Sequence, residues 1–157
     1  MDIDRTAHWE KVYETKAPSQ VSWTQEYPKT SFEIVQSFEL RKTARIIDVG
    51  GGDSRLVDCL LDAGYEDITV LDISEKALLR AQKRLGDRAS KVNWVVSDIT
   101  TFKPNRSFDV WHDRAAFHFL TEAEQISQYV ALASSCVKGY LSVGTFFSKN
   151  IFNLSSA

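Results

Sequence analysis

Three consecutive glycines, Gly50, Gly51 and Gly52, follow an apolar run that contains Asp48 and ends at Val49. The chain has seven glycines, so nearly half of them stand at this one place. A residue without a Cβ adopts positive φ angles freely and lets a ligand approach the backbone closely. The stretch therefore predicts either a nucleotide-binding turn, whose backbone contacts the ligand, or a tight turn that binds nothing.

The spacing of these glycines separates two classes of nucleotide ligand. A dinucleotide site needs G-x-G-x-x-G, in which the third glycine lets the helix pack tightly on the strand. Gly50 and Gly52 fit this pattern, but Arg55 stands at its third position. The mismatch disfavours an NAD-linked oxidoreductase, which stays as the weaker enzymatic alternative.

Alternating strand and helix patterns surround the glycines from about residue 44 onward. Short runs rich in β-branched residues, typical of buried strands, occupy 44–49, 67–72, 92–96, 107–112 and 139–147. Helical patterns occupy 54–65, 74–86 and 121–137, with Ser74 as an N-cap and Thr121-x-x-Glu124 as a capping box. Right-handed crossovers between such elements predict an α/β domain with a doubly wound, mainly parallel, Rossmann-like sheet.

Acidic residues stand where the predicted strands end. Ligands of an open parallel sheet bind beyond the carboxyl ends of its strands. Asp72 closes the second predicted strand, and an acid at that place suits the ribose of any nucleotide. Asp98 follows the third strand, where a dehydrogenase has no standard use for an acid. Asp72 therefore supports either kind of nucleotide ligand, and Asp98 favours one other than NAD.

These motifs resemble those of class I S-adenosylmethionine-dependent methyltransferases over about residues 44–147. Asp48-Val49-Gly50-Gly51-Gly52 matches the D-x-G-x-G signature of that family. Ser97-Asp98-Ile99 resembles its adenine-binding segment, and Phe108-Asp109-Val110-Trp111 resembles the motif before its active site. The resemblance implies the class I methyltransferase fold, S-adenosylmethionine as the cofactor, and methyl transfer to a small-molecule or protein side-chain acceptor.

The resemblance also implies a role for each matched position. Asp48 would accept a hydrogen bond from the ammonium of the cofactor's amino-acid tail, and the Gly50–Gly52 backbone would pack against tail and ribose. Asp72 would accept from both ribose hydroxyls, and Ile73 would lie against adenine. In Asp98-Ile99, the carboxylate would accept from the adenine amino group and the Ile99 N–H would reach a ring nitrogen.

The segment 110–121, VWHDRAAFHFLT, follows the fourth strand and would face the methyl group in this family. It resembles the W-x-R arrangement of thiopurine-methyltransferase-like enzymes, with His112 inserted. The predicted catalytic residues are Arg114 as an anchor for an acceptor carboxylate or phosphate, Asp113 beside it, and His118 or His112 as a base. The alternative is an Asp113–Arg114 pair that stabilises the loop, with both histidines in structural roles.

Residues 1–43 precede the predicted core and form an N-terminal arm with helices near 5–14 and 29–38. Its aromatic residues include Trp9, Tyr13 and Trp23. They either pack on the sheet or form a lid over the cofactor, where aromatic faces attract a sulfonium. Thiopurine-methyltransferase-like and some protein-lysine methyltransferases have a similar arm with tryptophans, which implies a cofactor-binding role for Trp9 and Trp23.

Length and composition limit the number of domains, the classes of partner and the location that the sequence allows. A length of 157 residues fits one domain, and a net charge of −2 argues against a nucleic-acid or anionic-membrane partner. No apolar run approaches the roughly 20 residues of a membrane span, and no metal-ligand motif is present in the sequence. Cys59 and Cys136 lie in apolar helical patterns and are expected to be reduced, which indicates a cytoplasmic location.

Few residues follow the last predicted strand. Class I methyltransferases add strands 6 and 7, for which the tail 148–157 is too short. The resemblance therefore implies a C-terminally truncated fold in which strand 139–147 has an open edge. We expect a homodimer or a higher assembly to cover it, and the alternatives are a monomer whose tail folds over the edge and an edge left open. The same shortage leaves a catalytically weak or inactive isoform as an alternative.

Overall fold

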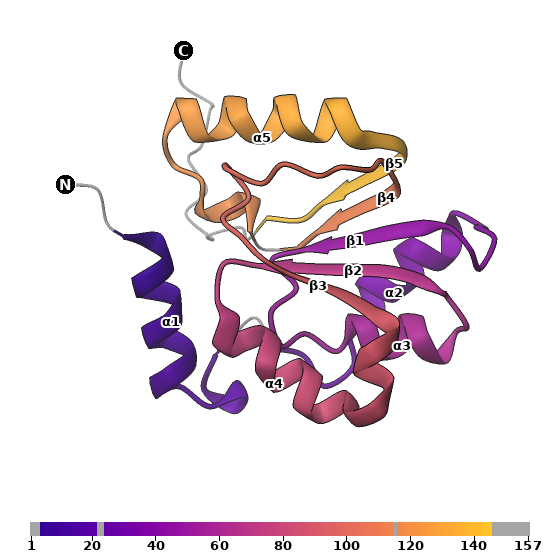
Figure 1. The fold of residues 1–157 in the computed structure, drawn as a ribbon, viewed down its shortest axis with the longest axis horizontal. Helices are drawn as coiled ribbons and strands as arrows, with labels where there is room; N and C mark the ends of the chain where they lie inside the picture. The colour runs from indigo at the N-terminus through magenta and orange to yellow at the C-terminus, as the bar shows by residue number, and fades with distance from the viewer. Residues whose placement is uncertain (1–3, 22–23, 115, 146–157) are drawn as a thin grey trace, which may run out of the picture.

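A computed structural model describes residues 4–21, 24–114 and 116–145 of the chain, and a five-stranded parallel sheet forms its centre (Figure 1). The strands are β1 (Arg45–Val49), β2 (Asp67–Asp72), β3 (Val92–Val96), β4 (Phe108–Asp113) and β5 (Val137–Val143). Their order is β3-β2-β1-β4-β5, and every neighbouring pair is parallel. The α/β fold class is therefore confirmed.

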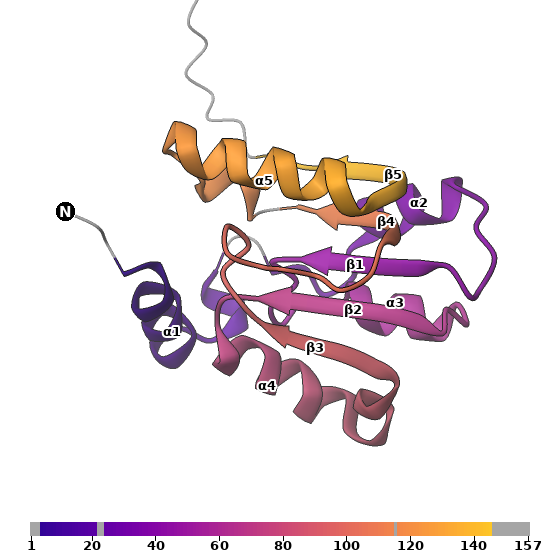
Figure 2. The same cartoon turned by 45° about the horizontal axis from the view of Figure 1, so that its top comes forward.

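Helices cover both faces of this sheet (Figure 2). They are α1 (Arg5–Thr15), α2 (Lys29–Ser37), α3 (Leu56–Asp62), α4 (Glu75–Leu85) and α5 (Ala123–Cys136), with 3-10 turns η1 (Pro18–Gln20), η2 (Gly86–Lys91) and η3 (Phe117–Phe119). Side chains of α2, α3 and α4 pack on one face, and those of α5 pack on the other. Helix α1 stands beside the carboxyl ends of the strands (Figure 1).

Successive residues of the inner strands β1 and β4 fill the two opposite cores. Ile46 and Val110 pack with the helices α2 to α4, whereas Ile47 and Trp111 pack with α5. Because both faces of a parallel sheet are buried, its strands are continuously apolar rather than alternating. Val35 of α2 is fully buried, so the second half of the N-terminal arm belongs to the packed layers.

The helix signals are confirmed in part. Ser74 caps α4, and its hydroxyl accepts a hydrogen bond from the Ala77 N–H at 3.2 Å. The predicted Thr121-x-x-Glu124 box is wrong, because Glu122 is the N-cap of α5. The Glu122 N–H donates to the Gln125 side-chain oxygen at 3.4 Å, which shifts the capping pattern along the chain by one residue.

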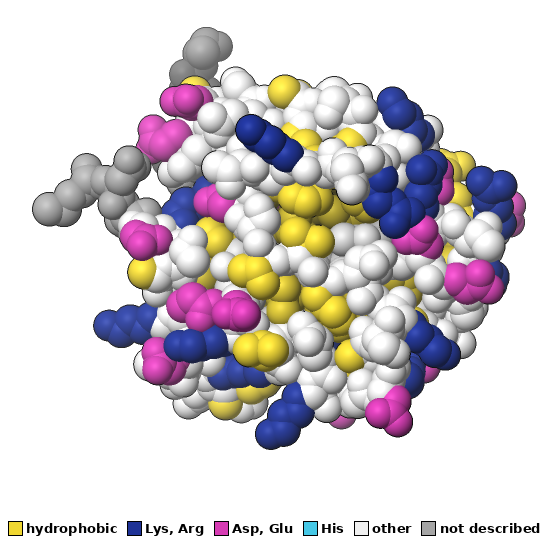
Figure 3. Space-filling model, viewed as in Figure 1, with side chains coloured by type: hydrophobic (Ala, Val, Ile, Leu, Met, Phe, Trp, Pro, Cys, Tyr) yellow, Lys and Arg dark blue, Asp and Glu magenta, His cyan; other side chains and the backbone are white. Residues whose placement is uncertain are grey.

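Both outer strands expose apolar side chains. Strand β5 begins two residues earlier than predicted, since Val137 already pairs with Phe108 directly after α5. Leu141 of β5 and Val96 of β3 are each 53% exposed. Figure 3 shows apolar side chains across the middle of the face seen in Figure 1, with charged side chains around them. The predicted tail 148–157 lies outside the described residues.

Within the described residues, none of the helices combines the length and the apolar character needed to cross a lipid bilayer.

Candidate cofactor and acceptor site

The glycine loop lies where the chain reverses its direction of travel across the sheet. Strand β1 continues to β2 on one side, and β4 returns on the other, so the carboxyl ends of β1 and β4 form the switch point at which such sheets bind ligands. Gly50 and Gly52 have φ angles of 66° and 48°. A Cβ on Gly50 would lie 2.7 Å from the Ala116 Cβ, and one on Gly52 would lie 2.8 Å from the Tyr13 hydroxyl. The protein's own packing therefore requires these glycines.

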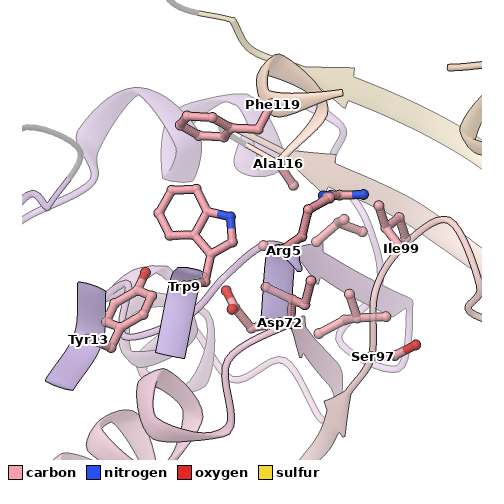
Figure 4. Close-up of a pocket in the computed structure, with 12 residues that line it drawn as sticks. Arg5, Trp9, Tyr13, Asp72, Ser97, Ile99, Ala116 and Phe119 are labelled. Atoms are coloured by element: carbon pink, nitrogen blue, oxygen red, sulfur yellow. The ribbon is translucent and has the colours of Figure 1, made fainter. Parts of the chain in front are cut away.

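A cavity of about 570 Å³, here the main cavity, opens beside this loop (Figure 4). Of the predicted cofactor residues, the structure brings five together in its lining: Trp9, Gly50, Asp72, Ile73 and Ile99. The main cavity is thus mostly apolar, with a single buried carboxylate from β2.

Asp72 provides that carboxylate. Its side chain is 5% exposed and points into the main cavity below Trp9 (Figure 4). One oxygen, Oδ1, accepts the Ser74 N–H at 2.8 Å. The pKa of Asp72 is raised to about 7, chiefly by burial and in part by the nearby carboxylates of Asp48 and Asp53, against the lowering effect of the Ser74 and Gly52 N–H groups. A carboxylate in this position accepts hydrogen bonds from ligand hydroxyls.

Asp98 lies beside the main cavity, between the lining residues Ser97 and Ile99, and its carboxylate is already bonded by other groups of the protein. Its Oδ2 is 3.1 Å from the Arg5 guanidinium, and its Oδ1 accepts from the Thr100 N–H at 2.9 Å and hydroxyl at 2.8 Å. Arg5 belongs to α1, so the arm and the segment after β3 are joined by this ion pair. An adenine-binding role for Asp98 stays a prediction and would require it to share its carboxylate with Arg5.

A second cavity of about 430 Å³ adjoins the main cavity, and both are lined by Tyr13, Val49 and Gly50. Asp48 and His112 are register partners on β1 and β4, and Asp48 Oδ1 lies 2.8 Å from His112 Nδ1. Both side chains are 5% exposed. An aspartate that bonds one imidazole nitrogen fixes the orientation of the ring.

Arg114 and Gly51 also line the second cavity, whereas Asp113 and His118 line neither cavity. The Arg114 guanidinium donates to the Gln25 side-chain oxygen, which joins the loop after β4 to the N-terminal arm. His118 is exposed on η3, with its ring edge-on to Phe119. Trp23 falls outside the described residues.

Asp113 faces the core beneath α5. Its side chain is fully buried, and its carboxylate accepts from the Tyr129 hydroxyl at 2.7 Å and the Ala116 N–H at 2.8 Å. The Tyr129 hydroxyl in turn accepts from the Trp111 indole N–H at 2.9 Å. Burial raises the pKa of Asp113 to about 6 despite these donors. This arrangement positions the turn that contains Ala116 and η3.

Several lining residues were not predicted. Arg5 on α1 and Phe119 on η3 line the main cavity without having been predicted, whereas Tyr13, which also lines it, is one of the aromatics expected to pack on the sheet or form a lid. The ring of Trp9 meets that of Phe119 edge-on, with the ring centroids 4.8 Å apart. Arg5, Trp9 and Tyr13 are spaced by four residues, which places them on one face of a helix. This spacing is the signal in the sequence that identifies Arg5.

Among the described residues, no group of three or more His, Cys, Asp or Glu side chains is arranged to hold a metal ion.

Comparison with known proteins places this geometry in a family. Residues 46–139 match the family described as methyltransferase domain. The eEF1A lysine and N-terminal methyltransferases of Mus musculus and Bos taurus are 26% and 28% identical over 76% and 75% of this chain. The chain spans 17% of the length of each of these relatives.

The fold has counterparts among solved structures. The S-adenosylmethionine-bound amino pentose methyltransferase CalS10 of Micromonospora echinaspora superposes with a TM-score of 0.65. The two are 17% identical, and the match covers 94% of this chain and 58% of CalS10. At this identity the likeness establishes the fold.

We predict that Tyr129→Phe lowers the free energy of unfolding by about 1–3 kcal/mol, because Asp113 loses a buried donor and the Trp111 N–H loses its acceptor. The loss should be larger at pH 8 than at pH 5. The Tyr129 hydroxyl favours the ionised carboxylate, so its removal raises the pKa of Asp113 further and penalises the charged form above pH 6. Urea unfolding at both pH values measures this difference.

Tyr140→Phe is the matched control for this substitution. Tyr140 is 44% exposed and its ring stacks on Phe38, so loss of its hydroxyl should change stability by less than about 0.5 kcal/mol. Equal losses for the two variants, or a loss independent of pH, would show that the buried network does not hold Asp113.

Proposed function

Because the chain belongs to the methyltransferase domain family and is a class I S-adenosylmethionine-dependent methyltransferase domain, we propose that it methylates an amine of a protein. The observation that carries the proposal is the buried Asp72 carboxylate in the main cavity beside the glycine loop. The protein acceptor is supported by the names of the relatives, which methylate lysine and N-terminal amines.

The residues around the two cavities fit S-adenosylmethionine. Asp72 would accept from the ribose hydroxyls, and Ile73 and Ile99 would lie against the adenine. Trp9 offers an aromatic face for a cation, and Asp48 a carboxylate for the ammonium of the amino-acid tail. The cofactor supplies an electrophilic methyl group on its sulfonium. The protein mainly contributes alignment of the acceptor with that group and exclusion of water.

An amine acceptor arrives protonated at neutral pH and needs a base before it can act as a nucleophile. We propose His112 as this base rather than His118. His112 lines the second cavity and is oriented by Asp48, whereas His118 lies on an exposed turn. Arg114 in the same cavity would hold a carboxylate of the acceptor, and Asp113 acts through the turn that it positions.

The cofactor assignment predicts the effect of Asp72→Ala on S-adenosylhomocysteine binding. Calorimetry should show affinity about 10–100-fold lower, since hydrogen bonds to a charged group contribute roughly 1.5–3 kcal/mol. Affinity of the wild type should also fall as the pH drops through about 7, where the Asp72 carboxylate takes up a proton. Asp62→Ala, which removes an exposed partner of Arg88, is the control. Unchanged affinity in Asp72→Ala would contradict the ribose assignment.

The acceptor assignment predicts that tritium from labelled S-adenosylmethionine enters purified eEF1A and does not enter eEF1A whose amines have been exhaustively acetylated, because an amide nitrogen is not a nucleophile. His112→Gln should lower the rate by about 100-fold, the lower end of the usual contribution of a general base. His118→Gln should keep the wild-type rate within about twofold. Transfer to the blocked protein, or a larger loss in His118→Gln, would overturn this assignment, and cofactor binding without transfer to any amine would favour the inactive alternative.

We also propose that a second copy of the chain covers the free edge of β5. Strand β5 pairs with β4 alone among the described strands, and Leu141 and Val143 on it are exposed. An uncovered apolar edge strand offers unpaired N–H and C=O groups to another chain.

Light scattering at micromolar concentration should then give twice the mass of one chain. Leu141→Lys should yield the monomer, because the charge is buried at the new interface. Val130→Lys on α5, at an equally exposed site, should leave the dimer intact. A wild-type monomer, or equal effects of both substitutions, would rule out association through β5.

A further inference from the structure

A third cavity, here the basic groove, runs between the segment after α1 and the helices α3 and α4. Its volume is about 1350 Å³, and its charged lining residues are Arg55, Arg80, Lys83, Arg84, Asp53 and Glu26. Four basic side chains thus face two acidic ones, on a chain whose net charge is −2. The groove is locally positive on a protein that is negative overall.

The four basic residues divide into two that build the groove and two that remain available. Arg84 binds the Asp58 carboxylate at 2.7 Å, and Arg80 binds backbone carbonyls of the arm, including that of Lys16 at 3.1 Å. Arg55 and Lys83 are exposed, and their side chains have no hydrogen bond or ion pair among the described residues. These two cations are therefore free to pair with an incoming anion.

The basic groove leads to the second cavity. Thr24 and Asp53 line both spaces, and Asp48 and His112 lie on the far side of this junction. The Thr24 hydroxyl oxygen is buried there and has no hydrogen-bond partner among the described residues. Buried polar atoms are nearly always hydrogen-bonded, so an unsatisfied one at a junction of cavities points to a ligand.

We propose that the basic groove binds an acidic segment of the acceptor protein, next to the amine to be methylated. This inference rests on the proposed transfer to a protein amine. Arg55 and Lys83 would pair with carboxylates of that segment, and Thr24 would bond a polar group where the chain turns toward His112. The segment's amine then lies beside the second cavity without any movement of the sheet.

The lining chemistry favours an acidic peptide over RNA. Glu26 and Asp53 in the groove repel a continuous phosphate backbone, whereas a peptide places its charges intermittently. Binding of single-stranded nucleic acid relies on stacking of bases on aromatic side chains, and none of the described residues that line the groove is aromatic.

Fluorescence anisotropy with a labelled glutamate-rich peptide that contains one lysine tests the proposal on the full chain. The double variant Arg55→Glu/Lys83→Glu should bind this peptide about tenfold more weakly at low salt, because two attractive contacts become repulsive. Lys91→Glu/Lys103→Glu makes the same change in net charge at exposed sites outside the groove, and should bind within about twofold of the wild type. Arg55 is the N-cap of α3, where glutamate suits the helix dipole, so the fold should persist.

Equal weakening in both double variants, or tighter binding of an oligouridylate of matching charge than of the peptide, would overturn the acidic-peptide assignment. Calorimetry with S-adenosylhomocysteine on the same proteins separates this proposal from the proposed function. A wild type that binds S-adenosylhomocysteine but not the peptide contradicts only the groove. A wild type that binds neither S-adenosylhomocysteine nor the peptide contradicts the cofactor assignment, on which the groove proposal rests.

Discussion

The confinement of three buried aspartates around one glycine loop is the constraint on which the site depends. Asp48, Asp53 and Asp72 are each at most 6% exposed, and their charges repel one another. Each is held by a different partner: Asp48 by His112 at 2.8 Å, Asp53 by Arg80 at 3.7 Å, and Asp72 by the Ser74 N–H at 2.8 Å. A ligand with a sulfonium and an ammonium offsets this negative charge, so the repulsion that costs stability in the free protein favours the cofactor.

The linkage between stability and pH follows from the same carboxylates. The pKa of Asp72 is raised from 3.8 to about 7, so the folded chain holds a proton that the unfolded chain releases. The contribution of this group to the free energy of unfolding therefore falls as the pH rises through that window. Near neutral pH the ligand-free site is under electrostatic strain, and Arg80 relieves part of it while also binding the arm. The Arg80 guanidinium thus contacts both Asp53, which follows the glycine loop, and the backbone of the arm.

The sequence predicts the parts of this arrangement that depend on local patterns. The carboxyl ends of β1, β2 and β3, the Ser74 cap and the place of Asp72 all follow from short apolar runs and the residues after them. The sequence does not predict where the Asp113 side chain points, because only the packing of α5 brings Tyr129 under the end of β4. The contact between Arg5 and Asp98 spans 93 positions and likewise depends on where α1 docks. Local patterns identify which residues gather at the switch point, and tertiary packing decides which of them face the ligand.

The docking of the arm also determines how the cavities connect. Tyr13 lines both the main and the second cavity, and Thr24 lines both the second cavity and the basic groove. Both residues belong to the arm, so the arm forms part of the wall of all three cavities at the carboxyl ends of the strands. Two of the contacts that hold α1 of the arm are ion pairs, Arg5 with Asp98 and Lys76 with Glu14, and salt screens such pairs near the surface. Ionic strength should therefore act on the main cavity and on the proposed acceptor path together, through the same helix.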